Sequence, residues 1–365
     1  MNIAIIGARG VPNFYGGFEQ FAEYLSKGLV ERGHQVTVYN SHTHPYQLSE
    51  WEGVRLVHRH DPEDKIGTVG QFIYDLNCIL HTRKENYDLI LQLGYTSSSI
   101  WGWLLPRHKS IVTTNMDGLE WKRSKYHPAV RWFLKKAESF ATVFSDHWIA
   151  DSLGIQKYLQ HEYHIPSVYI PYGAFAFENP DVSVIAPYEV QAGAYNMLVA
   201  RLEPENNIET ILDGVVKSKN RLPFLVIGKH ETSYGEYLKD KYRSTTEIMF
   251  IGGVYNIVAL NNLRYYSHLY FHGHSVGGTN PSLLEAMASG AYICAHDNIF
   301  NKTILEEDAS YFANVSDVTG LLDTSGEQKN RQAIINNTRK VNELYNWNTI
   351  IDQYEQHFID IFKNK

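Results

Sequence analysis

Two glycine-rich loops carry residue types that can bind a phosphorylated ligand. The first loop runs from Gly7 to Gly17, after a short apolar segment and before an amphipathic one, so it is expected to join a strand to a helix. Glycine lets the backbone approach an anion closely, and the first turn of a helix presents N–H groups that no helical carbonyl accepts. The Gly16–Gly17 pair directly precedes the expected helix and is therefore the predicted anion site. The alternative is a tight connection that binds nothing.

The second loop ends in Gly278, Thr279 and Asn280 and follows another apolar segment. Asn280 is a typical N-cap residue and Pro281 is favoured at the first helical position, so a helix is expected to begin there. Glu285 lies about one turn into that helix, where its carboxylate can accept hydrogen bonds from ribose hydroxyls. Ligands of open α/β sheets bind at the carboxyl ends of strands, which is where this loop should lie. A solvated glutamate on an ordinary capped helix is the alternative.

Spacing disfavours other cofactor and metal sites. The first loop lacks the Gly-x-Gly-x-x-Gly pattern of dinucleotide sites, which argues against an NAD-dependent dehydrogenase. Three pairs of histidines are spaced two residues apart, namely His42/His44, His58/His60 and His272/His274. They have no Cys or His partners at a recognised metal-binding spacing, and no two aspartates lie two residues apart. We therefore expect no bound metal ion.

Strands and helices of alternating type must position these loops. Apolar runs predict strands at Ile3–Ile6, Val36–Tyr39, Val54–Val57, Leu89–Leu93, Ile111–Thr114 and Val168–Ile170, then at Met197–Ala200, Phe224–Ile227, Met249–Ile251, Leu269–Phe271 and Tyr292–Cys294. Helical periodicity lies between most of these runs, and the last amphipathic stretch is Trp347–Phe362. The alternation predicts the α/β class with doubly wound parallel sheets.

The alternation lapses in the middle of the chain, which predicts two domains. We expect an N-terminal Rossmann-like domain over residues 1–173, a linker over 174–193 and a C-terminal Rossmann-like domain over 194–345. The remaining residues, 346–365, should form a helix that packs back on the N-terminal domain. The two domains are expected to face each other across a cleft.

Composition bounds the class of protein. The 365 residues are 44% hydrophobic and 13% aromatic, which excludes a disordered chain and allows two cores. The sequence contains no run of 18 apolar residues, so no membrane-spanning helix is expected. The first residues resemble a buried strand more than a signal peptide. The two cysteines, Cys78 and Cys294, suggest a reducing compartment, and the net charge of −7 argues against nucleic-acid binding. A cytoplasmic protein is expected.

A basic segment stands out against the acidic total. Between Trp121 and Lys136 the cations are Lys122, Arg123, Lys125, Arg131, Lys135 and Lys136, with no acidic residue. Pro128 can open a helix whose expected buried stripe is Val130, Phe133, Leu134, Ala137 and Phe140, and whose expected outer face is Arg131, Trp132, Lys135 and Lys136. A basic face with an exposed Trp suits docking on an anionic bilayer. A solvated face or a contact with a diphosphate are the alternatives.

Three segments together resemble a known family. They are Gly7-Ala-Arg-Gly-Val-Pro with Tyr15-Gly-Gly-Phe-Glu, Asp117-Gly-Leu-Glu-Trp-Lys-Arg-Ser-Lys125, and Ser275-Val-Gly-Gly-Thr-Asn-Pro-Ser-Leu-Leu-Glu285, supported by Ala200-Arg-Leu-Glu-Pro-Glu-Asn206. In order and over nearly the whole chain, they resemble the family 4 retaining glycosyltransferases of the GT-B fold. Within that family the chain is most similar to the streptococcal-type β-1,4-rhamnosyltransferases of capsule and rhamnan synthesis.

The resemblance implies roles for individual residues. The donor-binding residues would be Gly16, Gly17, Arg201, Gly278, Thr279, Asn280 and Glu285. Arg201 would neutralise the departing diphosphate, as such a leaving group requires. Glu285 would hold the nucleotide ribose, and Asp117 falls near the position where many relatives carry a His beside the reacting sugar. Arg201, Asp117 and Glu285 are therefore the residues expected to act in catalysis.

Three positions depart from the family pattern. Gly277 stands where the first carboxylate of a Glu-x7-Glu motif is usual, Asn206 stands where a Lys is usual, and Asp117 replaces the His. These changes fit a donor sugar other than glucose or mannose. Enzymes of this family are described with front-face attack, in which the leaving phosphate takes the acceptor proton, and without a metal ion.

The resemblance therefore implies transfer of L-rhamnose from dTDP-β-L-rhamnose to a saccharide on a polyprenyl diphosphate, at the inner face of the membrane. The residues that would contact the acceptor or the membrane are Trp121, Lys122, Arg123, Arg131, Trp132, Lys135 and Lys136. Tyr95 and Trp121 can stack on sugars, although core packing is the commoner role of aromatic residues. The alternatives are a UDP- or GDP-hexose donor, a sugar-nucleotide epimerase of the same architecture, and a non-catalytic nucleotide-sugar-binding protein.

Overall fold

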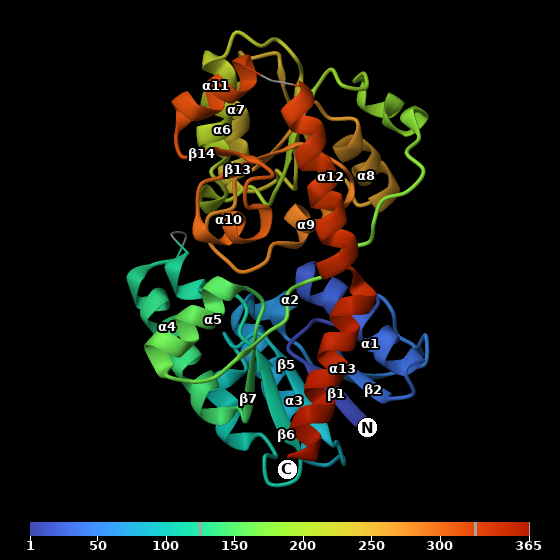
Figure 1. Ribbon diagram of the computed structural model, residues 1–365. Coiled ribbons are helices and arrows are strands. Elements are labelled where there is room, and N and C mark those ends of the chain that lie inside the picture. The colour runs from blue at the N-terminus through green and yellow to red at the C-terminus, as the bar shows by residue number, and fades with distance from the viewer. Residues whose placement is uncertain (124–125, 325–326, 365) are drawn as a thin grey trace. The chain divides into compact units, whose positions relative to one another are not determined.

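A computed structural model describes residues 1–123, 126–324 and 327–364, with the backbone alone for residues 327–330. The chain forms two compact units, which are described one at a time (Figure 1). The first unit contains residues 1–122 and 126–172 and the C-terminal segment from Trp347. The second contains residues 173–346 together with Arg123. Lys125, one of the cations predicted to face a membrane, lies outside the described residues.

The first unit is built on an eight-stranded sheet. Its strands are β1 (Asn2–Ile6), β2 (Gln35–Ser41), β3 (Glu50–Trp51), β4 (Val54–Arg59), β5 (Leu89–Leu93), β6 (Ile111–Asn115), β7 (His147–Ala150) and β8 (Val168–Tyr169). They lie in the order β3-β4-β2-β1-β5-β6-β7-β8, and every pair is parallel except β3 with β4. The central strands β1 and β5 are almost wholly buried, as uninterrupted apolar strands covered on both faces should be.

Helices cover this sheet. They are α1 (Gly17–Glu31), α2 (Glu63–Ile66), α3 (Val69–Thr82), α4 (Pro128–Phe144), α5 (Leu153–Tyr163) and α13 (Trp347–Lys363), with 3-10 turns η1 (Ser99–Leu104) and η2 (Glu120–Lys122). The C-terminal helix α13 lies along α1, as Figure 1 shows. A side chain at Gly28 of α1 would come within 2.4 Å of Ile351 Cδ1, so the absence of a Cβ allows the two helices to approach closely.

The second unit has a six-stranded sheet that is parallel throughout. Its strands are β9 (Asn196–Val199), β10 (Phe224–Ile227), β11 (Ile248–Gly252), β12 (Leu269–His272), β13 (Ile293–His296) and β14 (Ser310–Phe312). Their order is β11-β10-β9-β12-β13-β14, the strand order of a dinucleotide-binding fold. The helices are α6 (Ile208–Lys217), α7 (Ser233–Tyr242), α8 (Ile257–Tyr265), α9 (Pro281–Ala288), α10 (Ile299–Leu305), α11 (Val315–Asp323) and α12 (Glu327–Leu344), with 3-10 turns η3 (Val182–Tyr188) and η4 (Pro204–Asn206).

The structure confirms the predicted fold class, an α/β protein with two parallel-sheet domains. It also adds strands that the apolar runs did not reveal, β3, β7 and β14. Each of these is short, and β3 is the one antiparallel edge strand of the first sheet. Among the described residues, no helix combines the length and the apolar character that a membrane span requires.

Candidate functional site

The order of the strands in the second unit selects one place for a ligand. Strands β9 and β12 are neighbours, and the chain leaves β9 toward β10 on one side and β12 toward β13 on the other. Ligands of open α/β sheets bind outside the carboxyl ends of the strands at such a switch point. The segment that follows β9 contains Arg201, and the segment that follows β12 contains Gly278, Thr279 and Asn280. The topology therefore brings both predicted donor-binding segments of this unit to one edge of the sheet.

Direct contacts hold these two segments together. A Cβ at Gly273 would lie 2.0 Å from the carbonyl oxygen of Asn206, so only glycine permits this approach of the two backbones. Asn207 Nδ2 donates to the carbonyl of Gly273 at 2.8 Å, and Ser275 Oγ donates to the carbonyl of Glu205 at 2.7 Å. The site is therefore a preformed junction of two loops.

Asn206 and Arg201 belong to the same loop but differ in exposure. The Asn206 side chain is buried, and its Nδ2 donates to the carbonyl of Arg201 at 2.7 Å, so the residue that stands in place of a second cation braces the loop. Arg201 itself is exposed. Its guanidinium makes no ion pair with the described residues of the second unit, which leaves its charge available to an anion.

The helix that follows β12 begins where the sequence predicted. Asn280 is the N-cap of α9, and its Oδ1 accepts from the backbone N–H of Ser282 at 3.0 Å, while Pro281 occupies the first turn. Gly277 has φ of +131°, a conformation that L-residues rarely adopt, and the position of its missing Cβ is open space. This backbone conformation therefore disfavours a glutamate at the position where the family pattern has one.

Glu285 projects from α9 onto a buried arginine that sequence reasoning missed. Arg264 of α8 is 0% exposed, and its Nη2 donates to Glu285 Oε2 at 2.7 Å, while its Nη1 donates to Asn261 Oδ1 at 3.0 Å. The Glu285 side chain is 20% exposed. The sequence carried no signal for this pair, because a lone arginine in a helix is ordinarily a solvated residue.

Two stacked imidazoles lie at the end of β12. The rings of His272 and His274 are 4.4 Å apart with an interplanar angle of 16°. Burial, with the neighbouring charges of Arg201 and Arg123, lowers the pKa of His274 to about 3, and burial and His274 lower the pKa of His272 well below its usual value. Both rings are therefore neutral at pH 7. Among the described residues, no group of three or more His, Cys, Asp and Glu side chains is arranged to hold a metal ion.

The predicted anion site of the first unit is partly used by the protein's own side chains. Gly17 begins α1, and the N–H of Gly16 donates to Asn13 Oδ1 at 3.2 Å. Glu19 is buried in the first turn, where its Oε1 accepts from the N–H of Arg9 at 2.9 Å. A carboxylate of the protein therefore already lies at the positive end of this helix.

A buried carboxylate organises the segment around Asp117, which follows β6 in the first unit. Glu138 of α4 is 1% exposed and accepts hydrogen bonds from Tyr95 Oη at 3.2 Å and Trp121 Nε1 at 3.1 Å. The single hydroxyl hydrogen of Tyr95 is shared with the carbonyl of Gly118, 3.0 Å from Oη, and Tyr95 is only 1% exposed. The suggestion that Tyr95 stacks on a sugar is therefore wrong, because its ring is buried. Trp121 is partly exposed.

The expected faces of α4 need correction. Val130 and Phe140 were expected in the buried stripe, yet each is 41% exposed. Lys135 was expected outside, yet its Nζ donates to the buried Glu138 at 3.0 Å. The error arose because the charged pair Lys135–Glu138 takes the inner face, where apolar residues were expected.

Lys135 is held among aromatic rings. Its Nζ lies 4.9 Å from the ring centroids of Trp121 and Tyr163 and 4.8 Å from that of Tyr158. Burial disfavours the ammonium, but hydrogen bonds to Tyr158, Tyr163 and Glu138 outweigh this and raise the pKa of Lys135. Lys135 therefore stays protonated, and its positive charge is balanced by groups of the protein itself.

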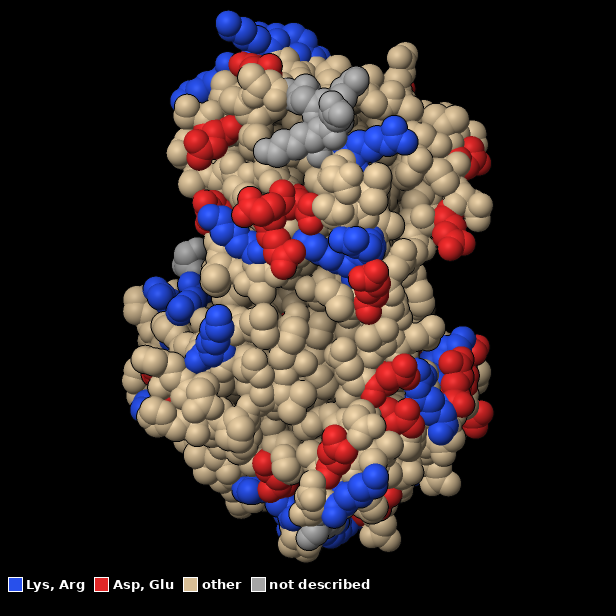
Figure 2. Space-filling model, in the orientation of Figure 1, with Lys and Arg blue, Asp and Glu red and all other residues tan. Residues whose placement is uncertain are grey.

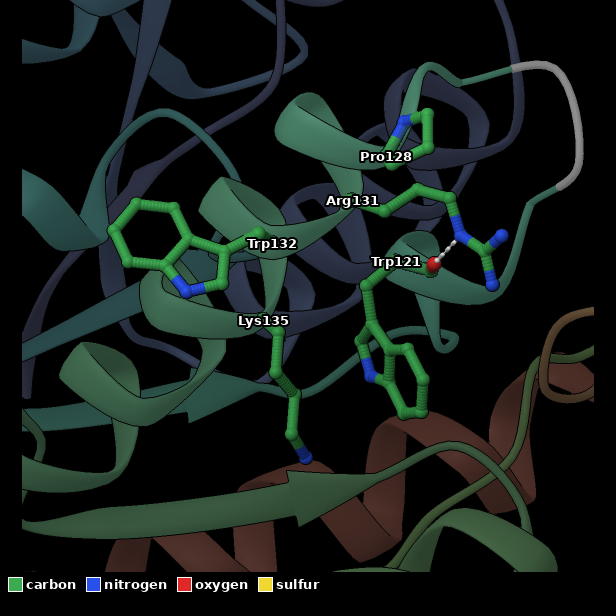
Figure 3. Close-up of a pocket in the computed structure, with 5 residues that line it drawn as sticks. All are labelled: Trp121, Pro128, Arg131, Trp132 and Lys135. Carbon is green, nitrogen blue, oxygen red and sulfur yellow. Dashed lines mark hydrogen bonds between the residues drawn. The ribbon is translucent and has the colours of Figure 1, made fainter.

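A shallow pocket of about 290 Å³ lies beside this cluster (Figure 3). Its lining residues are Trp121, Pro128, Arg131, Trp132 and Lys135. Figure 3 shows the two indoles projecting in different directions from η2 and α4, with Arg131 Nε bonded to the Trp121 carbonyl at 2.8 Å. Trp132 is 66% exposed and Lys136 is also exposed, as predicted for the outer face.

The remaining predicted cations differ in their surroundings. Lys122 is exposed, and its Nζ lies 5.3 Å from the ring centroid of Trp121. Arg123 belongs to the second unit, where its guanidinium pairs with Glu205 at 3.3 Å and is 14% exposed. Arg123 is thus largely buried, which is unlike a residue on a membrane-facing surface.

Comparisons with known proteins bear on this arrangement. Residues 1–175 match a family model described as a domain of unknown function, DUF1972. No curated protein sequence matches the chain.

Solved structures match over the whole chain. Sucrose-phosphate synthase from Thermosynechococcus elongatus has a TM-score of 0.80 at 18% identity and covers 100% of both chains. HepE from Anabaena, in complex with UDP, has a TM-score of 0.75 at 14% identity, covering 99% of this chain and 100% of HepE. WaaG, a glycosyltransferase involved in lipopolysaccharide biosynthesis, has a TM-score of 0.70 at 11% identity, covering 96% and 98%. Together with the two parallel sheets, these matches show that the chain has the GT-B fold.

Proposed function

We propose that the protein is a glycosyltransferase that binds a nucleotide-sugar donor on its second unit. One observation carries the proposal, namely that exposed Arg201 and the capped N-terminus of α9 follow the neighbouring strands β9 and β12. A guanidinium pairs with a diphosphate, and the positive end of the α9 dipole adds to that attraction, while the N–H groups of Ser282, Leu283 and Leu284 donate to Asn280. The structures of HepE in complex with UDP and with UDP-glucose support a nucleotide-sugar ligand for this fold.

The residues suit departure of a diphosphate. When the bond from the anomeric carbon to the phosphate oxygen breaks, negative charge grows on that oxygen, and Arg201 stabilises it. The acceptor hydroxyl oxygen bonds to the anomeric carbon on the same face, and its proton passes to the leaving phosphate. Configuration is thus retained, and neither a protein nucleophile nor a metal ion takes part. Asp117, which follows β6 in the first unit, is the group we assign to a donor or acceptor hydroxyl.

The donor we propose is dTDP-β-L-rhamnose, with a UDP- or GDP-hexose as the alternative. Resemblance of the loop segments supports rhamnose, and Gly277 supports a sugar that does not need the usual carboxylate contact. Gly16 and Gly17 stay in the proposal as a second contact with the donor.

The acceptor we propose is a saccharide on a polyprenyl diphosphate, reached by a cytoplasmic protein that docks on the inner face of the membrane. Exposed Trp132 and Lys136 on α4 support docking on an anionic surface. Figure 2 shows Lys and Arg side chains on the surface over α4. The pocket beside Trp121 and Arg131 offers an indole and a guanidinium for the acceptor.

A ligand panel followed by thermal unfolding tests the donor site. The ligands are dTDP-β-L-rhamnose, dTDP, UDP-glucose, GDP-mannose and NAD. A ligand at about 100 times its Kd stabilises the native state by about 2.7 kcal/mol, which raises the Tm measurably. We expect a shift with dTDP-β-L-rhamnose and dTDP, and a smaller shift in the Arg201→Ala variant. A shift with UDP-glucose alone would keep the transferase and reject rhamnose, and a shift with NAD alone would reject the proposed function.

A further inference from the structure

Arg264 combines complete burial with a full positive charge. It is the largest of the fully buried side chains, at 0% exposed, and it reaches from α8 to the carboxylate of Glu285 on α9. Its Nη groups bond to Glu285 and Asn261, whereas its buried Nε has no hydrogen-bond partner among the described residues. Burying an N–H group without a partner is unfavourable, so this arrangement is not the most stable filling of the space.

Stability alone gives a weak reason for such a pair. Replacing a buried ion pair by apolar side chains of similar volume is often neutral or stabilising. What a guanidinium provides that an apolar side chain does not is a planar set of donors that fixes the orientation of a carboxylate.

The surroundings hold Glu285 at both ends. At the side chain, Arg264 occupies Oε2 at 2.7 Å. At the backbone, the single hydroxyl hydrogen of Ser289 is shared between the Glu285 carbonyl, 2.7 Å from Oγ, and Asn261 Oδ1, 3.2 Å from Oγ. Asn261 thus links both contacts, and α8 and α9 together set the direction of the side chain. Since Glu285 is 20% exposed and Arg264 is buried, Glu285 is where this network meets solvent.

We propose that Arg264 is a positioning residue that aims the Glu285 carboxylate at a hydroxyl of the donor's nucleoside sugar. The inference rests on the proposed function, because it assigns a task to the same donor site. Arg264 touches no ligand in this scheme. Its effect is on how well Glu285 distinguishes a nucleotide that carries the hydroxyl from one that lacks it.

Calorimetric titration with two nucleotides separates this role from a structural one. The probes are dTDP and 2′,3′-dideoxythymidine 5′-diphosphate, which lacks the 3′-hydroxyl. The wild type should bind dTDP more tightly by about 10-fold or more, since a hydrogen bond to a charged group is worth about 1.5–3 kcal/mol. In Arg264→Met the ratio of the two Kd values should fall toward one. Arg264→Lys keeps the charge, is expected to fold even if Arg264→Met does not, and should give an intermediate ratio.

The matched control is Leu263→Ala, which removes a fully buried neighbour on the same helix without touching Glu285. This variant should have a lower Tm but the wild-type ratio of the two Kd values, because a general loosening of α8 weakens the binding of both nucleotides equally. A wild-type ratio retained in both Arg264 variants would overturn this inference and leave the donor site standing. If the wild type binds no nucleoside diphosphate at all, the proposed function falls first and this inference with it.

Discussion

Arg201 is the residue on which the proposed chemistry depends most. It is exposed, and Asn206, which takes the position of a second cation, is turned onto the loop backbone. Arg201→Ala should therefore lower kcat/KM for transfer by about 100-fold, the effect of removing one preorganised group at a developing charge. Steady-state assays with the donor selected by the ligand panel provide the measurement.

Arg221→Ala is the control for loss of a surface arginine. Arg221 is 67% exposed and pairs with Glu247, just before the amino end of β10 and therefore at the opposite edge of the sheet. Its variant should keep the wild-type rate. Equal rates for the Arg201 and Arg221 variants would remove Arg201 from the mechanism.

Gly277 and Gly320 offer a test of backbone conformation alone. A Cβ would meet nothing within 4 Å at either position, but Gly277 has φ of +131° whereas Gly320 lies within the helix α11. Gly277→Ala should lower the free energy of unfolding by about 1–3 kcal/mol because of strain. Gly320→Ala should raise it by about 0.5–1 kcal/mol, because alanine favours a helix. Urea titration measures both, and changes of the same sign would contradict the argument.

Sequence reasoning at the level of single residues succeeded where local rules decide the outcome. The capped start of α9 at Asn280 and Pro281 follows from local preferences and is confirmed. Arg264 and Lys135 were missed or misplaced, because each is buried through a partner distant in the sequence or on the unexpected face of a helix. Whether Arg201 and Glu285 bind a donor stays a prediction.

At the scale of elements, apolar runs predicted the strands that form the centre of each sheet. Strand β5 and strand β10 have the predicted bounds, since buried parallel strands are continuous apolar segments. Strands β7 and β14 lie toward the edge of their sheets and begin with His147 and Ser310. Their pairing depends on neighbours that are distant in the sequence, so the local pattern did not reveal them.

The docking of α13 makes the first unit sensitive to acid. His357 is 7% exposed, and its Nε2 lies 3.2 Å from Thr113 Oγ1 of β6. Burial and the neighbouring His147 lower the pKa of His357 to about 4, against the opposing charge of Asp360. In the unfolded chain this His has an ordinary pKa of about 6.5, so between pH 6.5 and pH 4 it binds a proton that the folded protein does not bind. The stability that depends on neutral His357 is therefore fully present above about pH 6.5 and is lost as the pH falls toward 4.

His357→Gln tests this dependence on pH. Between pH 7 and pH 5, the wild type should lose about 2 kcal/mol of stability through this group, and the variant should not. Urea titrations at the two pH values give the difference. His161→Gln, at an exposed position on α5, should behave as the wild type. An unchanged pH dependence in the His357 variant would show that α13 does not respond to this protonation.

At the scale of the whole molecule, the net charge of −7 opposes binding to an anionic surface, so any docking must come from a local face. Trp132, Lys136, Phe140 and Val143 follow one another at helical spacing along α4, and all four are exposed. An indole and two further apolar side chains around a lysine make a face suited to the headgroup region of a bilayer. The sequence alone could not identify this face, because basic residues fall on both sides of the expected helix α4.

Lys135 and Lys136 are adjacent, so they separate the two roles of a lysine on α4. Lys136→Gln should weaken binding to vesicles that contain anionic lipid by about fivefold, since one cation near the surface contributes about 1 kcal/mol, and should leave the Tm unchanged. Lys135→Gln should do the reverse, because Lys135 is paired with Glu138, and its loss leaves a buried carboxylate without its cation and lowers the Tm. Vesicle sedimentation and thermal unfolding measure the two effects. If both variants keep wild-type binding to vesicles, the lysine on the exposed face of α4 does not contribute to docking. If Lys135→Gln alone loses binding, the charge that binds the vesicles is on the inner face of α4.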